Sequence, residues 1–191
     1  MQTHHAPPPG LGDIKIPIIW SAEEQAEIEA VAARYPTRRS ALLPVLWKAQ
    51  RKFGWLSLDV IRLVGKTLSL PPSDVLAVAS FYTMFKRQPT GKYLIQVCQT
   101  LSCELGGAEK VVAHLKAALG ISEGETTPDG MFTLMRVECL ASCGSPPMMQ
   151  VDDDFYERLT PAKLDAILAG LRAGKPLARP EVDQWQWTNP S

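Results

Sequence analysis

Residues 92–143, KYLIQVCQTLSCELGGAEKVVAHLKAALGISEGETTPDGMFTLMRVECLASC, decide how the second half of this chain folds. The runs 92–97 and 131–137 predict β-strands, and residues 108–119 place apolar side chains at helical spacing. Two strands joined by a helix are expected to pair in parallel through a right-handed crossover, which puts their C-terminal ends at one edge of the sheet. Each predicted strand leads into a pair of cysteines, so the two pairs are expected to meet there.

The four cysteines of the chain all belong to these pairs, Cys98 with Cys103 as C-x4-C and Cys139 with Cys143 as C-x3-C. Thirty-five residues separate the pairs. Four thiolates from two loops can hold a tetrahedral zinc ion or an iron–sulfur cluster, because soft sulfur donors suit these metals. The sequence therefore predicts a metal centre with these cysteines as candidate ligands.

Other roles for paired cysteines fit less well. Disulfides need an oxidising compartment, and the N-terminal run MQTHHAPPPGLGD lacks the pattern of a secretory signal. A redox-active dithiol uses C-x-x-C at a helix start, which neither pair has. Zinc spacings extend to C-x4-C, so zinc stays open on spacing alone, whereas a dinuclear cluster suits the longer loops.

Composition sets broad limits on the class of protein. With 191 residues and 46% hydrophobic composition, the chain can bury a substantial core. Its 20 basic and 20 acidic residues cancel, which argues against nucleic acid as a partner. No apolar run approaches the roughly 20 residues that cross a bilayer, so we expect no direct membrane span and a cytoplasmic setting.

The chain divides into four predicted segments. Residues 1–19 form a proline-containing extended tail, 20–88 a helical domain, 89–175 an α/β domain, and 176–191 a C-terminal docking tail that carries Trp185 and Trp187. In the helical segment, helix signals predict four helices: 21–34 with a capping box at Ser21 and Glu24, 40–53, 57–68, and a short helix from 71.

The rest of the α/β segment predicts a hairpin and a final helix. Residues 147–151 and 155–159 form the hairpin around an aspartate turn at 152–154 that we interpret as a solvated tip, and a helix follows from Thr160 to Gly174. The fold class is α+β: a helical bundle, then a βαββα domain that resembles thioredoxin. None of the histidines is assigned as a ligand, and Glu104 and Glu138 are interpreted as orienting or surface groups.

Four stretches carry a resemblance to a known family: RKFGWLSLDVI (51–61), VLAVASFYTMF (75–85), VCQTLSCELGGAEKVVAHLKAALGI (97–121) and GETTPDGMFTLMRVECLASCGSPPMMQVDDDFYERLTPAKLDAIL (124–168). They resemble the small 2Fe-2S subunit of NADH:quinone oxidoreductase, respiratory complex I, over residues 20–175. The resemblance implies one 2Fe-2S cluster in a thioredoxin-like domain, with the ligands Cys98, Cys103, Cys139 and Cys143. Ser102 and the run 144–146 depart from the common pattern in the cluster loops.

The resemblance also implies a function and partners. The cluster would exchange single electrons with the flavin (FMN) of a separate NADH- and flavin-binding subunit, because this chain has no G-x-G-x-x-G dinucleotide fingerprint. A large iron–sulfur subunit of the peripheral arm is the second expected partner, on the cytoplasmic face of the inner membrane. An equivalent diaphorase subunit of an NAD-linked hydrogenase or formate dehydrogenase, and a zinc-stabilised interaction module, are the alternatives.

The charge of the cysteine loops predicts a low reduction potential. Residues 96–107 and 137–150 contain no lysine or arginine. Backbone amides, the hydroxyls of Thr100, Ser102 and Ser142, and a helix N-terminus are therefore expected to stabilise an added electron.

Overall fold

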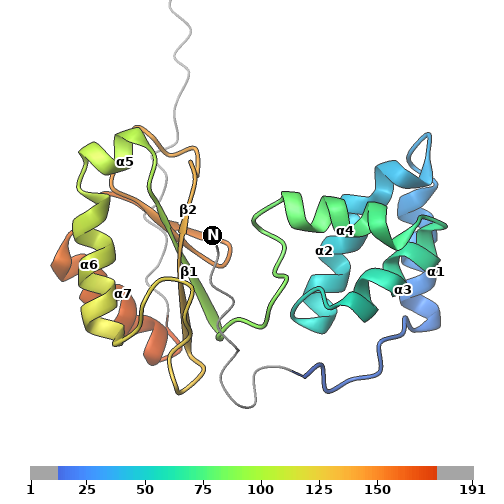
Figure 1. Ribbon diagram of the computed structural model, residues 1–191, viewed down its shortest axis with the longest axis horizontal. Coiled ribbons are helices and arrows are strands. Elements are labelled where there is room, and N and C mark those ends of the chain that lie inside the picture. Colours follow the sequence, from blue (N-terminus) through green and yellow to red (C-terminus); the bar gives the residue numbers. More distant parts are fainter. Residues whose placement is uncertain (1–12, 176–191) are drawn as a thin grey trace, which may run out of the picture. The chain divides into compact units, whose positions relative to one another are not determined.

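The computed structural model describes residues 13–175, so most of the predicted N-terminal tail and all of the predicted docking tail lie outside the described residues. The chain forms two compact units that join between Thr90 and Gly91, one helical and one built on a β-sheet (Figure 1). Among the residues described, no helix has both the length and the apolar character needed to cross a membrane.

The helical unit contains the four predicted helices. They are α1 (Ala22–Ala32), α2 (Leu42–Phe53), α3 (Leu58–Leu68) and α4 (Pro72–Phe81). A 3-10 turn, η1 (Arg38–Ala41), replaces the predicted start of the second helix at residue 40. Proline lacks a backbone N–H and is accepted in the first turn of an α-helix, so Pro44 fits an α-helix that begins only at Leu42.

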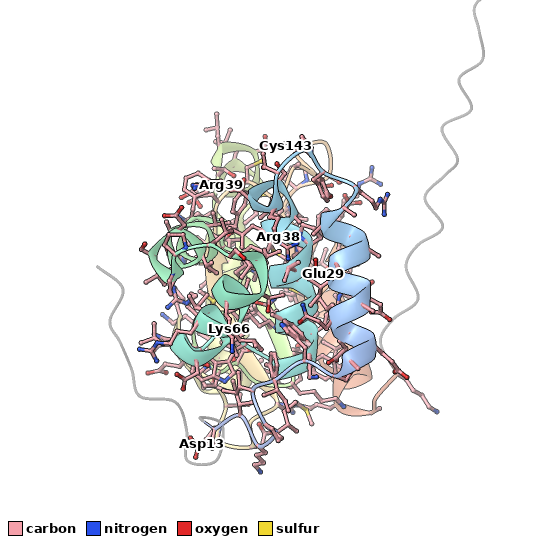
Figure 2. All side chains as sticks on the ribbon, turned by 90° about the vertical axis from the view of Figure 1, so that its right-hand side faces the viewer. Asp13, Glu29, Arg38, Arg39, Lys66 and Cys143 are labelled. Carbon is pink, nitrogen blue, oxygen red and sulfur yellow. The ribbon has the colours of Figure 1, made fainter. Side chains whose placement is uncertain are left out.

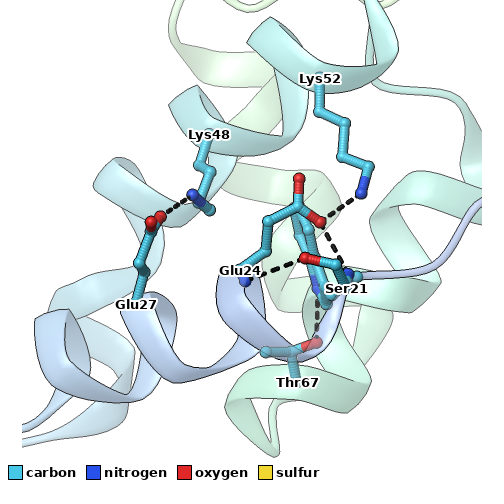
Figure 3. Close-up of polar contacts among 7 residues, drawn as sticks. Ser21, Glu24, Glu27, Lys48, Lys52 and Thr67 are labelled. Atoms are coloured by element: carbon cyan, nitrogen blue, oxygen red, sulfur yellow. Dashed lines mark hydrogen bonds and ion pairs between the residues drawn. The ribbon is translucent and has the colours of Figure 1, made fainter.

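Two serine caps start helices where the sequence predicts them. The Ser21 hydroxyl accepts a hydrogen bond from the Glu24 N–H (3.1 Å), and the Ser21 N–H donates to the Glu24 carboxylate (2.8 Å) (Figure 3). The same carboxylate forms an ion pair with Lys52 of α2, so the capping box also ties α1 to α2. Ser57 caps α3 by accepting from the N–H of Val60 (3.2 Å).

The core of the helical unit is apolar, and polar contacts surround it. Arg38 of η1 pairs with Glu29 of α1 (2.7 Å) and donates to the carbonyl of Thr67 in α3 (2.8 Å) (Figure 2). Ile14 and Ile18, which precede α1, pack against this core. The largest fully buried side chains of the core are Ile28, Leu46, Leu56, Ile61 and Leu68.

One buried polar side chain organises the end of the helical unit. Gln50 of α2, only 7% exposed, donates to the carbonyl of Met84 (3.0 Å) and accepts from the N–H of Lys86 (2.6 Å). Its side chain therefore forms hydrogen bonds with two backbone groups of the segment that follows α4. A buried amide needs such partners because its removal from water is otherwise unfavourable.

We predict that Gln50→Leu loosens this segment. The substitution removes the partners of two backbone groups, at a cost of about 1–3 kcal/mol for each, which corresponds to an at least ~30-fold larger population of the locally opened state. Hydrogen exchange by mass spectrometry should show faster exchange in peptides that contain Lys86. The matched control is Gln25→Leu, because the Gln25 side chain donates to the exposed Glu29 of the same helix (3.1 Å); equal effects of the two variants would contradict the prediction.

The second unit is a four-stranded sheet with helices packed on it. The strands are β1 (Tyr93–Cys98), β2 (Phe132–Val137), β3 (Met149–Val151) and β4 (Asp154–Tyr156), in the order β2-β1-β3-β4. As predicted, β1 pairs with β2 in parallel, and the other pairs are antiparallel. The helices α6 (Ala108–Leu119) and α7 (Pro161–Arg172) lie on the same side of the sheet (Figure 1).

The predicted βαββα order is confirmed, with one addition. A short helix, α5 (Leu101–Leu105), contains Cys103, which the sequence placed in a loop before a helix. The interpretation of the aspartate turn needs correction as well, because Asp152 adopts a φ of 51° and its carboxylate accepts from the N–H of Leu94 in β1 (3.3 Å). This aspartate therefore binds the sheet, and it is not merely a solvated tip.

Candidate metal centre

The parallel pairing of β1 and β2 brings the cysteine loops together. In the register of the two strands, Cys98 stands opposite Val137, and the Gln99 N–H donates to the Val137 carbonyl (3.0 Å). Cys139 follows two residues later. Both loops therefore leave the sheet side by side at the edge where the sequence predicts them.

The site has a buried half and an open half. Cys98 and Cys103 are each 2% exposed and pack with Ala108 and Met148 in a small apolar cluster, against which Leu140 rests. Cys139 and Cys143 are exposed, and all four cysteines are free thiols. Water is therefore excluded from one side of the site, while the other side can meet a partner.

The two sulfurs of the exposed pair lie close to the spacing of a chelate. The Sγ atoms of Cys139 and Cys143 lie 3.4 Å apart. Two thiolates on one tetrahedral metal ion, each at about 2.3 Å, would be separated by ~3.8 Å. The Ala141 N–H donates to the Cys139 Sγ (3.3 Å), and Ala141 itself adopts a left-handed conformation with a φ of 65°.

The thiols influence one another's ionisation. Burial raises the pKa of Cys103 to about 11, and the neighbouring sulfurs of Cys98 and Cys143 contribute to the rise. Burial also opposes ionisation of Cys98, but hydrogen bonds from the side chain and backbone of Thr100, from the backbone of Leu140 and from Cys103 together outweigh it and lower the pKa of Cys98. Thiolates in such proximity repel one another, and a bound cation removes that repulsion.

In the second pair, too, the pKa of one cysteine is lowered and that of the other is raised. The Ala141 N–H is the main cause of the lowered pKa of Cys139, and contact with Cys139 raises the pKa of Cys143. The Thr100 hydroxyl lies 3.1 Å from the Cys98 Sγ and also lowers the pKa of Cys139. Thr100 therefore lowers the pKa of one cysteine in each pair.

The other polar groups singled out from the sequence lie apart from the sulfurs. His114 of α6 pairs with Asp165 of α7 (2.7 Å), and Glu138 accepts from the Gln99 side chain (3.1 Å). Within residues 13–175, no three His, Cys, Asp or Glu side chains converge as ligands of a single metal ion would.

Gly106 allows the segment that contains Cys103 to approach the second cysteine loop closely. A Cβ added at Gly106, between α5 and α6, would lie 2.9 Å from the Pro146 Cβ and 3.1 Å from the Pro147 nitrogen. Pro146 and Pro147, joined by a cis peptide bond, follow the second cysteine pair. The turn at Gly106, directly after the helix that contains Cys103, thus rests on the loop that follows Cys143, and no local sequence signal reveals this contact.

The family model of the thioredoxin-like [2Fe-2S] ferredoxin matches residues 28–172, which include most of the described part of both units and all four cysteines. The chain belongs to the thioredoxin-like [2Fe-2S] ferredoxin family. As a member of this family it carries one [2Fe-2S] cluster, and free thiols at one sheet edge suit such a group.

Two curated relatives cover most of this ferredoxin. NADH-quinone oxidoreductase subunit 2 of Thermus thermophilus is 45% identical over 163 residues, which are 84% of this chain and 90% of the relative. A subunit of an NADH-quinone oxidoreductase from Rhizobium meliloti is 48% identical over 149 residues, 78% of this chain and 89% of the relative. The resemblance predicted from the sequence is therefore confirmed.

A solved structure shares the fold of this ferredoxin. The crystal structure of an NAD+-reducing [NiFe]-hydrogenase in the air-oxidised state aligns with a TM-score of 0.62 at 27% identity. The match covers 75% of this chain and 24% of the hydrogenase chain. The aligned region is therefore about a quarter of the length of that hydrogenase chain.

We predict that Gly106→Ala weakens the metal centre. The added methyl group would push the Cys103 loop away from Pro146, and disturbance of the support around a metal site typically costs roughly tenfold or more in affinity. The rate of iron loss to a chelator, followed by absorbance, should rise accordingly. Gly144→Ala is the matched control, because a Cβ there meets nothing within 4 Å; a Gly106→Ala protein that retains iron like the control would contradict the prediction.

Proposed function

We propose that this chain is the electron-transfer subunit of an NADH:quinone oxidoreductase, respiratory complex I, and that Cys98, Cys103, Cys139 and Cys143 bind its cluster. One observation carries the proposal: the parallel pairing of β1 with β2 sets both cysteine loops at one sheet edge. The relatives of similar length are named as subunits of NADH-quinone oxidoreductases, which supports the assignment to that complex.

The residues of the site suit transfer of single electrons. When bound, a [2Fe-2S] cluster accepts and releases one electron at a time. The burial of Cys98 and Cys103 excludes water from one half of the site, and the Thr100 hydroxyl and Ala141 N–H lie within hydrogen-bond distance of sulfur. Such contacts stabilise negative charge on thiolates.

Oxidation of NADH requires a hydride acceptor that the proposed subunit does not supply. Its sequence has no dinucleotide fingerprint, so FMN and NADH are assigned to a partner flavoprotein subunit, with the large iron–sulfur subunit of the peripheral arm as a further partner. Leu101 and Leu105 support docking beside the site, because both lie on the helix of Cys103 and are 74% and 81% exposed. We place the complex peripherally on the cytoplasmic face of the inner membrane.

A second candidate function has specific support. The structural match to an NAD+-reducing [NiFe]-hydrogenase favours the equivalent diaphorase subunit of such an enzyme as the alternative. The proposed site and its chemistry would be the same in both, and only the partner subunits would differ. Co-purification of the chain with its native partners separates these two functions.

Metal analysis tests the cluster assignment. The full chain, purified without oxygen, should contain about two irons and two acid-labile sulfides, and EPR should show an S = 1/2 signal only after reduction with dithionite. Cys139→Ser should lose most of this iron and the signal, because serine oxygen is a poor substitute for a soft thiolate. One zinc per chain with no EPR signal would instead establish the zinc-stabilised module.

We predict that Thr100→Val lowers the midpoint potential of the cluster. The substitution keeps the shape of the side chain but removes the hydroxyl near the Cys98 Sγ. A hydrogen bond to a charged group worth ~1–2 kcal/mol corresponds to about 40–90 mV for one electron. An EPR-monitored redox titration measures the shift. Thr100→Ser keeps the hydroxyl and should keep the potential; a shift of equal size in both variants would contradict the assignment.

A further inference from the structure

The segment that joins β4 to α7 holds the second cysteine loop from outside the sheet. The Arg158 N–H donates to the carbonyl of Ser145 (3.0 Å), and the Leu159 N–H donates to the carbonyl of Pro147 (3.0 Å). A third contact is made by a side chain, because the Ser142 hydroxyl donates to the carboxylate of Glu157. No pattern in the sequence assigned a role to Glu157.

Ser142 connects Glu157 to the cysteines. It lies between Cys139 and Cys143, and its hydroxyl is also 3.0 Å from the hydroxyl of Ser145. The sequence suggested that this hydroxyl stabilises an added electron. In the structure it is engaged by a carboxylate, which brings a negative charge into contact with the loop.

Two cationic residues, Arg158 and Lys163, follow Glu157 closely in the sequence. The Lys163 ammonium, at the start of α7, donates to the backbone carbonyl of Glu157 (2.5 Å), whereas Ser142 is the partner of the carboxylate. The loop from 137 to 150 contains no lysine or arginine that would offset that charge. A fixed negative charge next to a redox centre disfavours the arrival of an electron, since like charges repel most strongly where water is partly excluded.

We propose that Glu157 is a positioning residue of the cluster site: it anchors the Cys139–Cys143 loop through Ser142, and its charge lowers the midpoint potential of the cluster. This inference rests on the proposed cluster ligands. According to this inference, the segment between β4 and α7 influences the midpoint potential of the cluster although it contains no cysteine. Opposing effects on the potential thus come from Thr100 at one loop and Glu157 at the other.

The test compares two substitutions in the full-length chain. Glu157→Gln removes the charge but keeps an oxygen that accepts from Ser142, so the cluster and its EPR spectrum should be retained and the midpoint potential should rise. Glu157→Asp keeps the charge and should leave the potential close to that of the wild type. An EPR-monitored redox titration measures the potentials, with iron and sulfide assayed in each protein.

A charge control shows whether the effect is local. Asp165→Asn also removes one negative charge from this unit, but Asp165 pairs with His114 on α6, so the shift should be smaller than that of Glu157→Gln. Ser142→Ala removes the anchor and keeps the carboxylate, so it should speed cluster loss without the rise seen in Glu157→Gln.

Three results would overturn the inference. They are an unchanged potential in Glu157→Gln with full iron and sulfide, a shift no larger than that of Asp165→Asn, and a rise of equal size in Glu157→Asp. In each of these cases the cluster is still present, so the proposed function stands. A wild-type chain that holds no iron–sulfur cluster would instead refute the proposed function itself.

Discussion

The parallel hydrogen bonding between β1 and β2 is the constraint on which the site depends. The strands are separated in sequence by two helices and a long turn, yet their register sets Cys98 opposite Val137. Because the two strands run in the same direction, the loops that follow them begin at the same edge of the sheet and lie next to each other. The hydrophobic core between this sheet and α6 and α7 fixes the register, since slippage by one residue would turn its apolar side chains away from the core.

The two cysteine pairs stand in different environments, and this difference suits a protein that must both protect a redox centre and expose it. Cys98 and Cys103 lie in an apolar cluster with Met148, which limits access of water. Cys139 and Cys143 lie on an exposed loop, and Leu101 and Leu105 of α5 also face solvent. A relay of single electrons needs a protected centre and one accessible side toward its partner.

Electrostatics around the sulfurs comes from short polar groups, with no lysine or arginine in the two loops. The Thr100 hydroxyl and the Ala141 N–H favour negative charge, and the proposed role of Glu157 opposes it. Small changes among these groups would therefore move the potential while leaving the four thiols in place. The Arg136 guanidinium of β2 pairs with Glu109 and Glu123.

Local sequence patterns determined much of this protein. The periodicity of residues 108–119 located α6, the Ser21–Glu24 capping box located the start of α1, and the cysteine spacing located the candidate ligands. These features depend on residues a few positions apart. Only the tertiary structure placed Gly106 against Pro146, engaged Ser142 with Glu157, and set Gln50 against the backbone of Met84 and Lys86. Such contacts join residues 15 to 40 positions apart, and their identity depends on how packed elements meet, which no short-range period or spacing encodes.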